Sequence, residues 1–160
     1  PAVEATLALA RTLAQDGLRP AGEPLLDKAY PPALQTDEAR HAAYRARWLS
    51  SDPRSLAAML VMLASLDMEA DLARLPERTV LVGGSFDVLR PPSEIARLAT
   101  LAPQAESVIV PTGHMMATNS PRLLARLMDG YVAKGLCAAQ VCEDFLSDTA
   151  NRVGEVMHAA

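Results

Sequence analysis

The sequence predicts an α/β fold that is mostly helical and contains one small parallel βαβ unit. Residues 79–82 form a short run rich in β-branched side chains that ends on a glycine pair, which is typical of a buried parallel strand. Residues 107–110 form a second run of this kind. Between them, residues 93–102 follow two prolines and carry apolar side chains at helical spacing. A helical crossover between two strands of one sheet makes the strands parallel.

Two polar side chains follow these predicted strands: Asp87 after the first and His114 after the second. Ligands and catalytic groups collect beyond the carboxyl ends of parallel strands, so we expect the two residues to lie side by side. A carboxylate there can accept the Nδ1 proton of an imidazole and stabilise the imidazolium formed when Nε2 takes a proton. Taken singly, Asp87 would be a turn aspartate that binds its own backbone, and His114 a structural histidine.

The segments that carry these residues, VLVGGSFDVLRPP and ESVIVPTGHMMATNSPRLLARLMDGYV, resemble the last two core strands of the α/β-hydrolase superfamily. In that family the chain order is nucleophile, acid, histidine. The resemblance implies that Asp87 is the triad acid and His114 the base, and it implies no cofactor. The chain contains no G-x-S-x-G pentapeptide; the nearest match, residues 83–87, ends in Asp, and we interpret Ser85 as structural. The resemblance therefore implies a carboxyl-terminal fragment of a hydrolase whose nucleophile lies outside this chain.

Under the same resemblance the chain divides into three parts. Residues 1–75 are similar to a helical cap, residues 76–134 to the carboxyl-terminal part of the α/β core, and residues 135–160 form a helical extension. Helical spacing and cap residues predict helices over 1–18, 37–49, 53–66 and 68–75, with 19–36 a proline-rich connector that holds at most one helical turn. Asp52 is the predicted cap residue of the third of these helices.

The helices after His114 have predicted burial patterns. The helix that starts at Ser120-Pro121 has an apolar stripe formed by Leu123, Leu124, Leu127, Met128 and Tyr131. The extension offers Leu136, Val141, Phe145, Leu146, Val153 and Val156 for burial. We expect the extension to pack on the body of the protein or to pair with a second copy.

Caps of this family roof the active site and set substrate choice. Trp48, the sole tryptophan, is therefore a candidate for a substrate-binding residue, although a packing anchor between cap helices is the alternative. Met115, which directly follows His114, is a second candidate for substrate binding. No cluster of His, Cys, Asp and Glu has the spacing of metal ligands, so the sequence predicts no metal.

Composition limits the classes of partner. Half of the 160 residues are hydrophobic and 21% are charged, which is typical of soluble globular proteins. A net charge of −4 and 4% aromatic residues argue against nucleic-acid binding, and no run approaches the roughly 20 apolar residues of a membrane span. Cys137 and Cys142 are interpreted as two apolar core residues in a reducing compartment, so we expect a cytoplasmic protein.

Two strands do not form a stable sheet alone. We therefore expect a homodimer, a companion amino-terminal segment, or helices folded back over the open edges of the sheet. The predicted function is that of a hydrolase acting on an ester, lactone or similar small acyl substrate, with this chain inactive on its own. The alternative is a non-catalytic helical interaction or dimerisation module with a vestigial βαβ unit.

Overall fold

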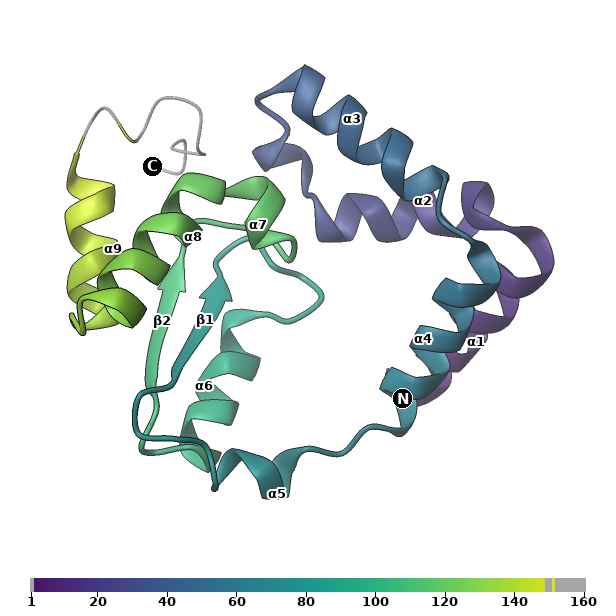
Figure 1. Ribbon diagram of the computed structural model, residues 1–160. Helices are drawn as coiled ribbons and strands as arrows, with labels where there is room; N and C mark the ends of the chain where they lie inside the picture. The colour runs from purple at the N-terminus through teal and green to yellow at the C-terminus, as the bar shows by residue number, and fades with distance from the viewer. Residues whose placement is uncertain (1, 149–150, 152–160) are drawn as a thin grey trace. The chain divides into compact units, whose positions relative to one another are not determined.

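The computed structural model describes residues 2–148 and residue 151, which form two compact units (Figure 1). The first unit contains the residues up to Asp27 together with Glu38–Met68. The second contains Lys28–Asp37 together with the residues from Glu69 onward. This grouping differs from the predicted division at residue 75, because residues 28–37 and residues 69–75 belong with the second unit.

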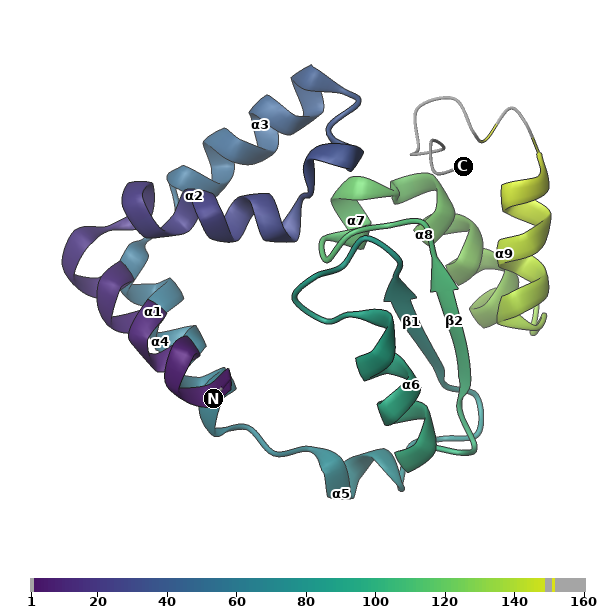
Figure 2. The same cartoon turned by 180° about the vertical axis from the view of Figure 1, so that it is seen from behind.

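The first unit is built around two helices that lie side by side, α1 (Ala2–Asp16) and α4 (Pro53–Ser65) (Figures 1 and 2). Gly17 ends α1, as predicted, with a φ of +81° that favours glycine. The buried core of this unit is formed by Ala10, Leu13, Leu18 and Ala57. Half-buried leucines pack around it: Leu9, Leu49, Leu56 and Leu60.

Helix α2 (Leu18–Ala29) contradicts the prediction that residues 19–36 are a connector. Pro20 lies in the first turn, where a backbone N–H has no partner within the helix, so it costs no helical hydrogen bond. Pro24 lies inside the helix and does remove one. The helix forms nevertheless because Leu18 and Leu26 are both buried on folding. Only the 3₁₀ turn Pro32–Leu34 and its flanks remain of the predicted connector.

Two further helices of this part follow the predicted pattern closely. Helix α3 spans Glu38–Leu49 and begins one residue later than predicted. The predicted cap of α4 is confirmed, because a carboxylate oxygen of Asp52 accepts the Ser55 N–H at 2.7 Å. Helix α5 (Glu69–Leu72), which belongs to the second unit, is shorter than the predicted 68–75.

The second unit contains the predicted βαβ unit. Strands β1 (Val80–Gly84) and β2 (Glu106–Val110) are parallel and pair in register from Val80–Glu106 to Gly84–Val110. Helix α6 (Pro92–Leu101) makes the crossover and contacts both strands. The prediction of a mostly helical chain with a small parallel sheet is therefore confirmed.

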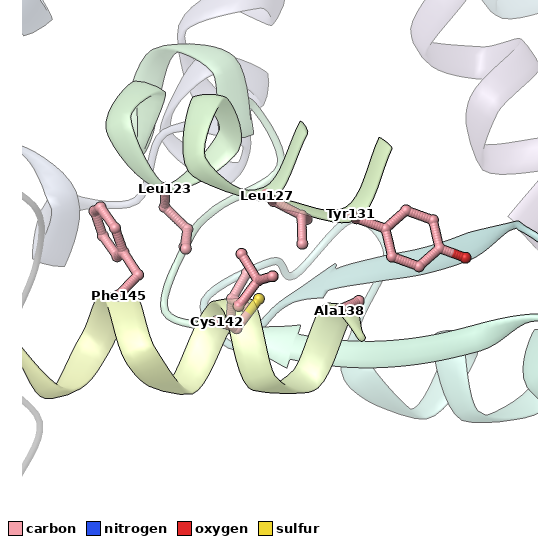
Figure 3. Close-up of a cluster of buried hydrophobic side chains, with 8 residues drawn as sticks. Leu123, Leu127, Tyr131, Ala138, Cys142 and Phe145 are labelled. Atoms are coloured by element: carbon pink, nitrogen blue, oxygen red, sulfur yellow. The ribbon is translucent and has the colours of Figure 1, made fainter. Parts of the chain in front are cut away.

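The helices after β2 cover the other face of this sheet. They are α7 (Met116–Asn119), α8 (Pro121–Leu127), a π-helical segment (Met128–Ala133) and α9 (Ala138–Ser147). Figure 3 shows their buried side chains, among them Leu123, Leu127 and Tyr131 facing Ala138, Cys142 and Phe145. Half-buried Val80, Val82 and Val108 of the strands pack against this cluster. Helix α9 is thus part of the core of the second unit.

The predicted burial pattern needs three corrections. Met128 is 57% exposed, because it lies about 100° around the helix from Leu127, beyond the buried stripe. Leu136 is 47% exposed, since it precedes α9 in an irregular segment. Cys137, interpreted as a core residue, is exposed at the start of α9, whereas Cys142 is buried as predicted. Val141 and Phe145 are buried as predicted, and Val153 and Val156 lie outside the described residues.

Arg78 joins the start of β1 to the end of the π-helical segment. Its guanidinium lies 4.5 Å from the centre of the Tyr131 ring and donates to the carbonyl oxygen of Tyr131. A cation at this position neutralises the negative end of the helix dipole and satisfies a terminal carbonyl.

Among the described residues, no helix is both long and apolar enough to cross a lipid bilayer.

Candidate functional site

The two loops that leave the carboxyl ends of β1 and β2 are held together by backbone hydrogen bonds. The N–H of Ser85 donates to the carbonyl of Val110 at 2.9 Å, and the N–H of Phe86 donates to the carbonyl of Thr112 at 3.1 Å. These bonds continue the pairing of the strands beyond the sheet. The residues that follow, Asp87 and His114, are thereby brought to one edge of the sheet.

Asp87 and His114 make a direct side-chain contact. Nδ1 of His114 lies 2.9 Å from Oδ2 of Asp87, which is a normal length for a hydrogen bond between an imidazole and a carboxylate. With the carboxylate ionised, Nδ1 carries the hydrogen and Nε2 keeps its lone pair. The imidazole can then act as a base through Nε2.

The other oxygen of Asp87 binds the backbone of its own loop. Oδ1 accepts the N–H of Leu89 at 2.8 Å and the N–H of Arg90 at 2.9 Å. Asp87 is therefore also the turn aspartate considered as its alternative role. The two roles are compatible because each uses a different oxygen, and the turn fixes which oxygen faces His114.

The two members of the pair differ in exposure. The side chain of Asp87 is only 8% exposed, whereas that of His114 is 36% exposed. A buried carboxylate that accepts three N–H groups is rigid, while an exposed imidazole can be approached from outside the chain. The arrangement suits a fixed acid that orients a base for a reaction at Nε2.

The loop around His114 also contains buried polar groups that sequence reasoning missed. Oγ1 of Thr112, both polar atoms of the Asn119 amide and Oγ of Ser120 are buried and have no hydrogen-bond partner among the described residues. The Asn-Ser-Pro sequence at 119–121 marks the start of a helix, but it contains no signal that these side chains would be buried. The sequence does hold a signal for the N–H donors of Leu89 and Arg90. In such turns the carboxylate of an aspartate often accepts the backbone N–H two or three residues further along the chain.

The remaining candidate residues have structural contacts. Trp48 lies in the first unit, where its indole N–H donates to the carbonyl of Gly22 at 3.0 Å and its ring lies 6.4 Å from that of Tyr44. These contacts are those of a packing anchor, the alternative role of Trp48. Met115 is half-buried beside His114, and its carbonyl accepts the N–H groups of Thr118 and Asn119, both at 2.8 Å. Ser85 is exposed at the end of β1.

Among residues 2–148 and 151, no group of three or more His, Cys, Asp and Glu side chains is arranged to hold a metal ion. Burial raises the pKa of the Cys142 thiol, and the neighbouring Cys137 adds to this effect. A thiol with a raised pKa is a poor nucleophile, so Cys142 is a packing residue.

Comparison with known proteins found no matching family model, no matching curated protein and no matching solved structure.

Proposed function

We propose that this chain supplies the acid and the histidine of an α/β-hydrolase-type triad that acts on an ester, lactone or similar acyl substrate. The observation that carries the proposal is the 2.9 Å contact between Nδ1 of His114 and Oδ2 of Asp87. It stands at the carboxyl ends of two neighbouring parallel strands, where catalytic groups of α/β proteins collect.

The chemistry follows from the roles of the two side chains. A hydroxyl nucleophile from outside this chain attacks the acyl carbonyl carbon while Nε2 of His114 takes its proton. Asp87 stabilises the resulting imidazolium through Nδ1–H. The imidazolium then gives its proton to the leaving alkoxide, which completes the acyl-enzyme. Water repeats the sequence at the acyl carbon and releases the carboxylic acid.

The test compares this chain with a longer protein, expressed from the same reading frame with the upstream coding sequence included. We expect the longer protein to hydrolyse p-nitrophenyl esters and a serine-directed fluorophosphonate to stop it. We expect His114→Ala to lower kcat/KM by at least about 10⁴-fold, because residues of a triad act as a unit. His41→Ala, which removes a histidine from α3, is the matched control and should retain activity. Full activity of His114→Ala would remove His114 from the site.

The chain alone is expected to hydrolyse these esters no faster than background. Fluorophosphonate-sensitive turnover by the chain alone would contradict the proposal that the nucleophile lies outside it. Ser85, exposed at the end of β1, would then be the residue to replace.

A specific observation favours the alternative of a helical interaction module. Helix α4 packs one face on α1, yet its other face is also apolar. That second stripe consists of Met59, Met62 and Leu63, each at least 43% exposed and spaced as one helix face, and the exposed Leu66 directly follows the helix. Exposed stripes of this kind mark interaction surfaces. Sedimentation of Met62→Glu distinguishes the candidates: loss of self-association supports the module, and an unchanged sedimentation coefficient counts against it.

A further inference from the structure

We propose that Gly84 is a positioning residue for the Asp87–His114 pair: its lack of a side chain lets the loop of His114 approach within hydrogen-bonding distance of Asp87. The inference builds on the proposed role of this pair. It concerns the geometry of the pair, however, and can be tested without any enzymatic assay.

The space beside Gly84 is occupied by backbone. A Cβ atom at this position would lie 2.3 Å from the carbonyl oxygen of Thr112, 2.9 Å from its carbonyl carbon and 3.1 Å from the carbonyl oxygen of Gly113. Real Cβ atoms essentially never approach other atoms below 3.0 Å. Backbone atoms cannot rotate out of the way as a side-chain end can, so the whole loop would have to move.

Conformational freedom does not account for this glycine. Among the described residues, only Gly17 and Gly135 have positive φ angles, so the backbone of Gly84 is open to any L-residue. The close approach of two backbones is what requires a glycine here.

The contact that Gly84 permits is tied directly to the pair. The same Thr112 carbonyl accepts the N–H of Phe86, the residue before Asp87, at 3.1 Å. The carbonyl of Gly84 accepts the N–H of Asp87 at 3.1 Å. Retreat of the Thr112 carbonyl would break the bond to Phe86 and carry His114, two residues further on, away from Oδ2.

The neighbouring Gly83 offers a matched control. A Cβ atom there would meet Cγ1 of Ile95 at 2.6 Å and Cδ1 of Ile109 at 2.7 Å. These are side-chain atoms on the face of the sheet that α6 covers, away from the two loops. Gly83→Ala therefore disturbs packing in the same strand without pressing on the loop of His114.

The experiment measures the tautomer of His114 in the intact 160-residue chain from its imidazole nitrogen chemical shifts, at a pH where the ring is neutral. In the wild type we expect the Nδ1–H tautomer to dominate, because Asp87 accepts that hydrogen. We expect Gly84→Ala to lose this dominance and Gly83→Ala to keep it, even where thermal unfolding shows that both variants are destabilised. Retention of the wild-type tautomer in folded Gly84→Ala, or equal loss in both variants, would overturn the inference.

A second measurement serves if Gly84→Ala does not fold. Amide hydrogen exchange in the wild type reports the bond from Phe86 N–H to the Thr112 carbonyl. Slow exchange of this amide is expected. Unprotected exchange alongside a dominant Nδ1–H tautomer would show that the pair does not depend on the close approach at Gly84. Absence of esterase activity in a longer protein would contradict the proposed function. It would not affect the conclusions from the His114 tautomer and the Phe86 amide exchange.

Discussion

Of the two carboxylate oxygens of Asp87, only Oδ2 faces His114, and it lies 2.9 Å from Nδ1 of the ring. Oδ1 is held by the N–H groups of Leu89 and Arg90. These two backbone donors fix the orientation of the carboxylate independently of His114.

This orientation predicts the effect of Asp87→Asn. The amide oxygen must take the place of Oδ1, because only an acceptor can bind two N–H donors. The amide NH₂ then faces Nδ1 and can only donate to it. We expect the chain to fold and His114 to change from the Nδ1–H to the Nε2–H tautomer, as measured by imidazole nitrogen shifts. An unchanged tautomer would show that the Asp87 contact does not control the ring.

A second prediction concerns the packing of α9 on the π-helical segment. A Cβ atom at Gly130 would lie 2.5 Å from Cγ2 and 2.9 Å from Cγ1 of Val141, whose branched side chain has little freedom to rotate. We expect Gly130→Ala to lower the free energy of unfolding by about 1–3 kcal/mol in urea titrations. Val132→Ala, at a side chain that is 73% exposed, should change it by less than about 0.5 kcal/mol. Stabilisation by Gly130→Ala would mean that α9 does not pack here, since alanine is otherwise the better helix former.

A third prediction addresses the core of the first unit. Leu13 is fully buried between α1 and α4, so Leu13→Ala leaves a cavity and should cost about 2–5 kcal/mol of unfolding free energy. Val3→Ala, on the exposed side of α1, is the control and should cost far less. Equal effects of the two substitutions on thermal unfolding would contradict the packing of α1 on α4.

The cap of α4 predicts a pH dependence. The Ser55 hydrogen bonds hold the pKa of the Asp52 carboxyl below its ordinary value of 3.8. A carboxyl whose pKa is lower in the folded state stabilises the fold above its unfolded pKa, and this contribution is lost as the pH falls through the folded pKa. We expect the difference in unfolding free energy between wild type and Asp52→Ala to narrow progressively as the pH falls below 3.8.

Asp52→Asn is the control for that experiment. Asparagine caps helices about as well as aspartate but does not titrate, so its advantage over Asp52→Ala should be independent of pH. A wild-type advantage that persists unchanged in strong acid would show that the charge of Asp52 does not contribute to the cap.

Helix α2 illustrates where sequence reasoning failed. Pro20, Pro24 and Pro31 suggested a connector, because proline weakens helices wherever an N–H is needed. The structure places Pro20 in the first turn, where no N–H is needed, and buries Leu18 and Leu26 of the same helix. Local signals could not show this burial, since it depends on residues distant in the chain.

The sequence alone predicted the parallel βαβ unit, the cap at Asp52, the stop at Gly17 and the meeting of Asp87 with His114. These features could be predicted because strand periodicity, crossover length and cap chemistry are local properties. Only the tertiary structure decided that α9 belongs to the core, that Met128 faces outward, and that Gly84 lies against the Thr112 carbonyl. These relationships depend on which distant atoms share a space, and close packing settles that for the folded chain as a whole.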